Sequence, residues 1–247
     1  MVNQGATASE YGPAISHGVG AVNVGTSVMA CKFKDGVVVA ADTAISYGGM
    51  RMEKNARRVK KLTDECVFAC SGEMADAQQL EKLLMKKQEH DEMEQDGATF
   101  LRPRDYFNWV ARHNYQRRCK MNPLWVGTVI GGVCKQSGEH FLGMADLYGL
   151  ALEQNYILTG LSTHYCQVIM EKGWRPDLTE QEAKDLLATC ASVMFCRDKK
   201  AIDKLQFSVT TREGVRLEEP VQVDSNWSLS FYSQKTNEFW RPLRIRE

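Results

Sequence analysis

The sequence has no excess of charge of either sign. Its 31 Lys and Arg residues are balanced by 31 Asp and Glu residues, which leaves no formal net charge at pH 7. Nucleic acids and anionic membranes attract proteins through a broad positive field, and this composition provides none. We therefore expect neither nucleic acid nor a membrane as a partner.

Long hydrophobic runs are also missing. The longest extends only over residues 37–41, whereas a helix needs roughly 20 apolar residues to span a bilayer. The first 25 residues contain neither Lys nor Arg, so they fit neither a secretory signal nor a helical transit peptide. We expect residues 1–25 to be a flexible leader in front of a single domain at residues 26–220.

Cysteine and histidine are present, but in none of the spacings that bind metals, such as C-x-x-C or H-E-x-x-H. The cysteine pattern suits a reduced, intracellular protein without disulfides. No metal and no cofactor is expected. A cysteine nucleophile at Cys31, Cys66 or Cys70 is an alternative, although cysteines inside buried strands are usually inert.

The first half of the domain begins with strand signals. Apolar runs at residues 26–33 and 37–41 flank Asp35-Gly36, which predicts an antiparallel hairpin. A further strand is predicted at residues 67–70, and Ser71 is the expected N-cap of the helix that follows. A second helix is expected to begin near Pro103, because proline in the first helical turn loses no hydrogen bond.

The second half repeats this order, with strands predicted at residues 126–133 and 140–144. Thr179 and Glu182 form a capping box before a helix with an apolar stripe, and strands at residues 205–210 and 215–218 follow. Strands and helix pairs that alternate in this way are incompatible with a series of βαβ units. We predict an α+β fold, a four-layer αββα sandwich in which two antiparallel sheets lie between helical layers.

Several of these motifs resemble the proteasome β family. The match covers nearly everything after the leader and includes Gly25-Thr26-Ser27-Val28, the hairpin up to Asp42, and Ser71-Gly72. Residues 120–125 and 129–132 resemble a non-catalytic branch of the family. The resemblance implies the fold of the N-terminal nucleophile hydrolases and a place in the 20S core particle. The implied partners are β subunits of the same and the opposite ring and α-ring subunits, in cytoplasm and nucleus, with a role in ubiquitin-dependent protein degradation.

The resemblance also places a degenerate catalytic site at Thr26, Asp42 and Arg58. In active relatives, proteolysis makes a threonine N-terminal, and its own α-amine, with a pKa of about 8, takes the hydroxyl proton. Thr26 matches this nucleophile and Asp42 the family acid, but Arg58 stands where the family has a lysine. A lysine ammonium can release a proton, whereas a guanidinium stays charged. We therefore expect Asp42 and Arg58 to form a buried, structural ion pair.

Three further positions follow from the same resemblance. Asp198 matches a family acid, Ala201 replaces a serine that helps to hold the amine, and Thr159 is a candidate for another serine. We therefore predict that no residue is catalytic and that Thr26 is a hydroxyl at the start of a strand. One alternative is a processed, active threonine endopeptidase with Thr26 as its nucleophile. Another is a different N-terminal nucleophile hydrolase that acts on small amides.

Residues 221–247 are predicted to be an extension that contacts other subunits, because they mix aromatic and arginine side chains in the manner of interface anchors. The candidate contact residues are Trp227, Phe231, Tyr232, Phe239, Trp240 and Arg241. The resemblance implies that this extension reaches the opposite ring and helps to join half-particles; the alternative is that it folds back on its own domain. Basic clusters at residues 54–61 and 112–120 are interpreted as solvated or subunit-facing surface.

Overall fold

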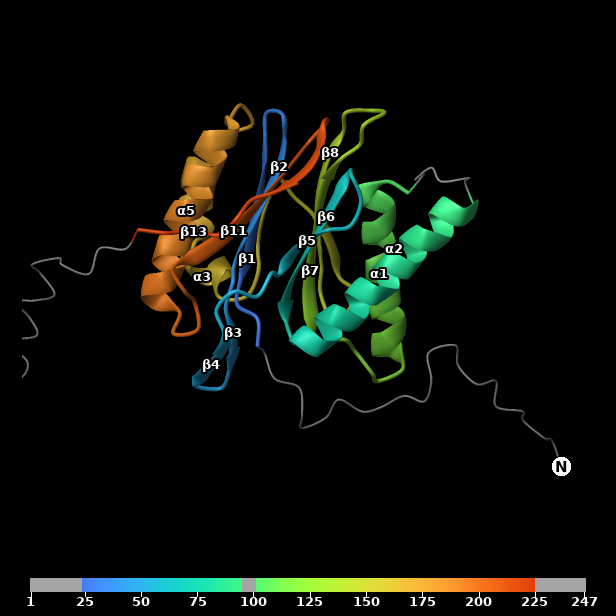
Figure 1. Ribbon diagram of the computed structural model, residues 1–247, viewed down its shortest axis with the longest axis horizontal. Coiled ribbons are helices and arrows are strands. Elements are labelled where there is room, and N and C mark those ends of the chain that lie inside the picture. Colours follow the sequence, from blue (N-terminus) through green and yellow to red (C-terminus); the bar gives the residue numbers. More distant parts are fainter. Residues whose placement is uncertain (1–23, 95–100, 225–247) are drawn as a thin grey trace, which may run out of the picture.

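The computed structural model describes residues 24–94 and 101–224 of the chain. Two antiparallel sheets lie face to face between two groups of helices (Figure 1). Helices α1 (Met74–Glu94) and α2 (Pro103–Cys119) cover one sheet, and α5 (Glu180–Arg197), with the shorter α3 (Ser162–Tyr165) and α4 (Gln167–Gly173), covers the other. The predicted α+β class is confirmed.

The first sheet has the order β10-β1-β2-β11-β12, and β13 also pairs with β11. Its strands are β1 (Val28–Phe33), β2 (Gly36–Asp42), β10 (Tyr156–Leu158), β11 (Lys204–Thr211), β12 (Gly214–Leu217) and β13 (Val221–Gln222). β1 and β2 form the hairpin predicted from Asp35-Gly36, in the register Val28 opposite Ala41. This register brings the start of β1 beside the end of β2, where the candidate site lies.

The second sheet has the order β5-β6-β7-β8-β9. Its strands are β5 (Val59–Lys61), β6 (Cys66–Gly72), β7 (Val126–Val133), β8 (His140–Ala145) and β9 (Ala151–Glu153). A separate hairpin of β3 (Ile45–Tyr47) and β4 (Met50–Glu53) extends from the same end of the molecule as the start of β1 (Figure 1).

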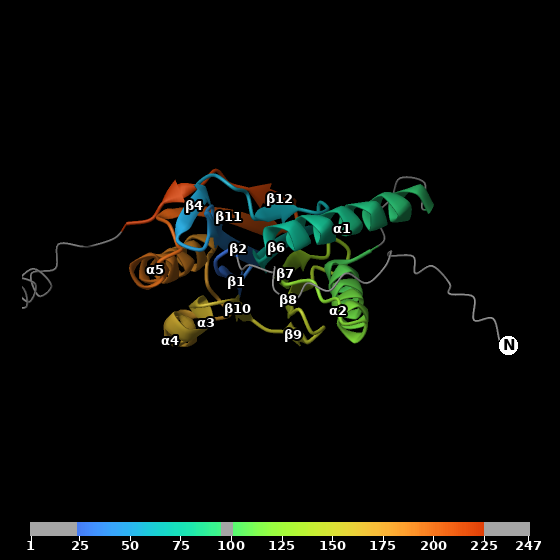
Figure 2. The ribbon, with the colours of Figure 1, turned by 90° about the horizontal axis from the view of Figure 1, so that it is seen from below.

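Successive side chains of a strand point to opposite faces of its sheet, so a strand made mostly of apolar residues supplies apolar side chains to both faces. In β1, Met29 and Phe33 pack against the helical side with Leu187 of α5, whereas Val28 and Ala30 face the other sheet. A third apolar layer joins the second sheet to α1 and α2. In the described part of the chain, apolar side chains therefore pack between the sheets and beneath each group of helices. Figure 2 shows the helices on the outer sides of the sheets.

Two helices begin where the local sequence signals predict, and the start of a third differs from its prediction. α2 begins at Pro103 as predicted, and the Thr179 hydroxyl accepts from the N–H of Glu182 at 3.3 Å in the predicted capping box of α5. The prediction that Ser71 caps the next helix is wrong. Ser71 lies inside β6, its hydroxyl donates to the carbonyl of Gly127 at 3.4 Å, and α1 begins only at Met74. Pairing with β7 therefore extends β6 beyond its apolar run.

Among the described residues, no helix combines the length and apolar character that crossing a membrane would require.

Candidate active site

Thr26, Asp42 and Arg58 come together at one end of the two sheets. Thr26 precedes β1 and Asp42 ends β2, so the hairpin register places them side by side. Arg58 directly precedes β5 in the other sheet and extends its side chain between the sheets. Only 1% of Arg58 is exposed, and Asp42 and Thr26 are also buried. The structure therefore assembles the three residues that the sequence singled out.

The guanidinium of Arg58 holds this group together. Its Nη2 donates to the Thr26 hydroxyl at 2.8 Å and forms an ion pair with Oδ1 of Asp42. Its Nη1 donates to the carbonyl of Thr26 at 2.7 Å, and its Nε donates to the carbonyl of Asp42 at 3.0 Å. The Thr26 hydroxyl donates its own proton to Oδ1 of Asp42. The buried ion pair expected from the sequence is confirmed.

These contacts define what the group can do chemically. A guanidinium remains protonated at any physiological pH and offers only donors, so Arg58 stabilises negative charge but takes up no proton from Thr26. A buried charge needs both an ionic partner and hydrogen bonds to offset its desolvation. Arg58 has the Asp42 carboxylate and several carbonyl oxygens, including those of Ser27 at 3.2 Å and Cys70 at 3.3 Å. Its environment is therefore that of a structural cation.

The two described residues before Thr26 are bound to both neighbouring strands. The N–H groups of Val24 and Gly25 both donate to the carbonyl of Gly72, at 3.0 and 2.8 Å, and Ser46 N–H donates to the carbonyl of Val24 at 3.1 Å. A Cβ on residue 25 would lie only 3.3 Å from Nη1 of Arg58, so glycine suits this close approach. Val24 and Gly25 thus belong to the folded domain, although the predicted leader includes them.

Asp198 and Ala201 lie beside this group without a direct bond to Thr26. Asp198 is the C-cap of α5, and its Oδ1 accepts from the N–H of Lys200 at 2.9 Å. Ala201 lines a small apolar cavity together with Thr26 and Asp42. The next residue, Ile202, donates its N–H to Oδ2 of Asp42 at 3.3 Å. The segment between α5 and β11 therefore supports Asp42 from the backbone.

Two hydroxyl groups near Thr26 have structural partners. The Thr159 hydroxyl accepts from Val28 N–H at 2.8 Å and donates to the carbonyl of Val28 at 3.2 Å, so it ties β10 to β1. The Ser27 hydroxyl accepts from the N–H of Ser162 at 3.0 Å at the start of α3. The sequence analysis missed this role of Ser27, because its partner lies 135 residues away along the chain.

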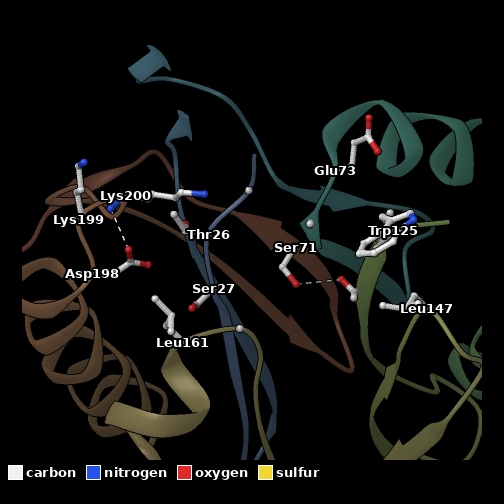
Figure 3. Close-up of a pocket in the computed structure, with 15 residues that line it drawn as sticks. Thr26, Ser27, Ser71, Glu73, Trp125, Leu147, Leu161, Asp198, Lys199 and Lys200 are labelled. Atoms are coloured by element: carbon white, nitrogen blue, oxygen red, sulfur yellow. Dashed lines mark hydrogen bonds between the residues drawn. The ribbon is translucent and has the colours of Figure 1, made fainter. Parts of the chain in front are cut away.

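Thr26 borders a pocket of about 600 Å³ (Figure 3). Trp125 and Leu147 line one side, and Asp198, Lys199 and Lys200 line the other. Leu161 and the backbone of Gly25 and Gly72 complete the wall. A concave site with an apolar wall and charged groups on its rim is suited to a peptide or a small ligand.

The alternative nucleophiles Cys31, Cys66 and Cys70 are buried in strands. Burial raises the pKa of Cys31 to about 12 and that of Cys70 to about 11, and it raises the pKa of Cys66 as well. A thiol with such a pKa is almost fully protonated at neutral pH, whereas the thiolate is the nucleophile. These cysteines therefore suit core packing better than catalysis.

Comparison with known proteins agrees with this arrangement. Residues 22–210 match the family model for proteasome subunits. The chain belongs to the proteasome family and is a β-type subunit. The resemblance read from the opening hairpin is thus confirmed. The matched residues include every element from β1 to most of β11, and with them Thr26, Asp42, Arg58, Asp198 and Ala201.

Several relatives within the proteasome family align along most of their length. Proteasome subunit beta type-4 of Arabidopsis thaliana is 36% identical over 212 residues, which cover 86% of this chain and 85% of the relative. The beta type-4 subunit of Xenopus laevis is 33% identical, with 87% and 89% covered. Proteasome subunit beta type-7 of Saccharomyces cerevisiae is 29% identical, with 81% and 79% covered.

The predicted interface residues Trp227, Phe231, Tyr232, Phe239, Trp240 and Arg241 lie outside the described residues. The first part of the predicted extension is described and belongs to the sheet. Val221 and Gln222 form β13 against β11, and the carbonyl of Asp224 accepts from the Ser192 hydroxyl of α5 at 2.8 Å. The domain therefore continues to Asp224, four residues beyond the boundary expected at residue 220.

Proposed function

We propose that this chain is a non-catalytic, structural β subunit of the 20S proteasome core particle. In this role it contributes to the wall of a proteolytic chamber with the N-terminal nucleophile hydrolase fold, while sister subunits carry the peptidase activity. Its partners are β subunits of the same and the opposite ring and subunits of the α ring. It serves ubiquitin-dependent protein degradation in the cytoplasm and nucleus.

The hydrogen bond from Arg58 to the Thr26 hydroxyl carries the proposal. Nucleophilic attack by threonine requires a group that accepts the hydroxyl proton and returns it later. A guanidinium donates without accepting, and the amide nitrogen of an unprocessed Thr26 is not basic. Ala201 supplies no hydroxyl to orient an amine. These features favour a site that is kept for its stabilising contacts.

The test combines intact mass with activity of the assembled particle. We expect this subunit to begin upstream of Thr26, and we expect the particle's peptidase activities to be unchanged in the Thr26→Ala variant. A mature chain that begins at Thr26, together with loss of one peptidase activity in the variant, would overturn the proposal. Thr26→Ser serves as the control that retains the hydroxyl.

The alternative is an active threonine endopeptidase, favoured by the contact between Thr26 and Asp42 and by the pocket beside it. An epoxyketone inhibitor distinguishes the two, because it reacts with an N-terminal threonine and would label Thr26 only in an active subunit. Size-exclusion chromatography tests the other alternative, a hydrolase of small amides, because such an enzyme would elute as a small oligomer and not as a large particle.

We further propose that residues 225–247 join half-particles by contacting the opposite β ring. Because β13 and Asp224 are held by the domain, the informative truncation removes residues 225–247 and retains β13. The truncated chain should fold and enter half-particles, while the joining of two half-particles slows. Joining at the wild-type rate would refute this role of the extension.

A further inference from the structure

A basic and aromatic surface lies where α2 meets the loop between β8 and β9. We call it the α2 patch and define it by Tyr115, Arg118, Met121, Tyr148 and Leu150. Met121 is 82% exposed, Tyr148 59%, and Tyr115 and Leu150 each 52%. The loop adjoins α2 at Tyr115, and Met121 follows the end of the same helix. Tyrosine, arginine and methionine are enriched in protein interfaces, and exposed apolar side chains of this size indicate a binding surface.

Contacts between helix and loop hold the patch in a defined shape. The side-chain amide of Asn114 donates to the carbonyl of Asp146 at 2.9 Å. Gly149 packs so closely on α2 that a Cβ there would lie 2.6 Å from Cβ of Tyr115. Oδ1 of Asp146 accepts from the N–H groups of Tyr148 and Leu150, both at 2.8 Å, and so orders the loop.

Met121 adopts a backbone conformation that usually belongs to glycine. The N–H of Met121 donates to the carbonyl of Arg118 at 3.0 Å and that of Asn122 to Arg117 at 3.1 Å, which is the Schellman pattern of a helix end. This pattern requires a left-handed residue, and Met121 has a φ of 54°. The strained residue exposes a long apolar side chain, and backbone strain of this kind is concentrated at functional sites.

Positive charge predominates at the end of α2, whereas the nearby carboxylate of Asp146 is held by the N–H groups of Tyr148 and Leu150. The last two turns of α2 and the residue after them carry Arg112, Arg117, Arg118 and Lys120, and the sequence has no Asp or Glu between Asp105 and Glu139. The guanidinium of Arg118 lies 5.8 Å from the ring centre of Tyr115. Charge complementarity therefore favours an acidic partner.

We propose that the α2 patch binds an acidic, apolar-bearing segment of another subunit of the particle, an inference that rests on the proposed function. The acidic side chains would meet the arginines at the end of α2, and the apolar ones would cover Met121, Tyr148 and Leu150. Nucleic acid fits less well, because the whole chain carries no net charge and the patch exposes leucine and methionine.

The first experiment maps the partner by photo-crosslinking. The photoreactive residue p-benzoylphenylalanine replaces Tyr148 in the full-length chain, which is assembled into particles, irradiated and analysed by mass spectrometry. We expect a crosslink to a neighbouring subunit at a segment rich in Asp and Glu. Crosslinks to a neutral or basic segment, to nucleic acid, or only within the chain would overturn the proposal. The same residue at Tyr47, which is 53% exposed on the β3–β4 hairpin, is the positional control.

The second experiment separates binding from folding. Met121→Gly removes the side chain but suits the left-handed backbone, so the variant should fold as well as the wild type. We expect the Met121→Gly chain to enter particles more slowly than the wild type. The Arg118→Glu chain should enter about tenfold more slowly, and its rate of entry should depend less on salt concentration.

The controls are Met93→Ala and Lys86→Glu, which alter exposed residues of α1. Entry of both patch variants at the wild-type rate would overturn the proposal, whereas a wild-type chain that enters no particle would instead contradict the proposed function.

Discussion

Arg58 donates a hydrogen bond of 2.8 Å to the hydroxyl of Thr26, the candidate nucleophile of the sequence analysis. The same guanidinium is paired with Asp42 and is almost fully buried. In this chain the three positions therefore act as a cross-link between the two sheets, with the cation at its centre.

Loss of Arg58 should strongly destabilise the domain. Arg58→Ala leaves the Asp42 carboxylate buried without its cation, which typically costs about 3–5 kcal/mol. We expect the free energy of unfolding of the isolated chain, measured by urea titration, to fall by that amount. Arg57→Ala is the matched control, because its pair with Glu219 lies in solvent and should contribute less than about 1 kcal/mol. Equal effects of the two variants would contradict the structural role of Arg58.

Met121→Gly should stabilise the chain. A left-handed conformation costs a residue with a Cβ roughly 1–2 kcal/mol, and glycine avoids most of that cost, although it also loses entropy on folding. We expect the midpoint of thermal unfolding to rise by a few degrees. Gly138→Ala should have the opposite effect, because Gly138 has a φ of 72° and open space around it, so that only backbone strain is added. A lower midpoint for Met121→Gly would contradict this reasoning.

Acid should destabilise the fold through His113. Burial, with Arg117 and Lys120 nearby, lowers the pKa of His113 to about 4, from an ordinary value of 6.5. Between pH 6.5 and about pH 4, His113 is therefore protonated in the unfolded chain but neutral in the folded chain. The free energy of unfolding has its full value above pH 6.5 and declines as the pH falls.

The size of this effect is measurable. Between pH 7 and pH 5, His113 should account for a loss of about 2 kcal/mol in the free energy of unfolding. His113→Phe keeps a ring against Trp109, which is stacked on His113 with ring centres 5.0 Å apart, but removes the titration. We expect the variant to lose less stability than the wild type over this range. Identical pH profiles would show that His113 does not titrate in the predicted way.

Thiol labelling should distinguish core cysteines from surface cysteines. Cys119 and Cys196 are exposed, whereas Cys31, Cys66 and Cys70 are buried with a raised pKa. Iodoacetamide at neutral pH should modify the first two in the folded chain, and all of them after denaturation. Rapid modification of Cys70 in the folded chain would revive the interpretation of this residue as a nucleophile.

Elements with strong local signals could be predicted from the sequence. Asp35-Gly36 predicts the hairpin, Pro103 the start of α2, and Thr179 with Glu182 the start of α5. The β3–β4 hairpin was not predicted, since all four residues of β4 are exposed and no apolar alternation marks them. Ser71 was assigned to a helix because the pairing that keeps it in β6 comes from residues more than fifty positions later.

The candidate site also has one part that could be predicted from the sequence and one part that could not. The pairing of Asp42 with Arg58 could be predicted because the family resemblance gives both positions. The support from Ile202 N–H and the contacts of Arg58 with the carbonyls of Ser27 and Cys70 could not, because backbone groups of distant segments carry no residue-type signal. Val221 and Gln222 belong to the sheet because they pair with β11, and the amino-acid composition of this segment does not indicate that pairing.

The pairing of β2 with β11 has a consequence for synthesis of the chain. Ala40 lies opposite Phe207, so the hairpin made first by the ribosome finds its second neighbour only when most of the polypeptide has emerged. Contacts between such distant residues form slowly. Until then the Val-rich edge of β2 lacks its second partner, and unpaired edges of this kind favour pairing with strands of other chains.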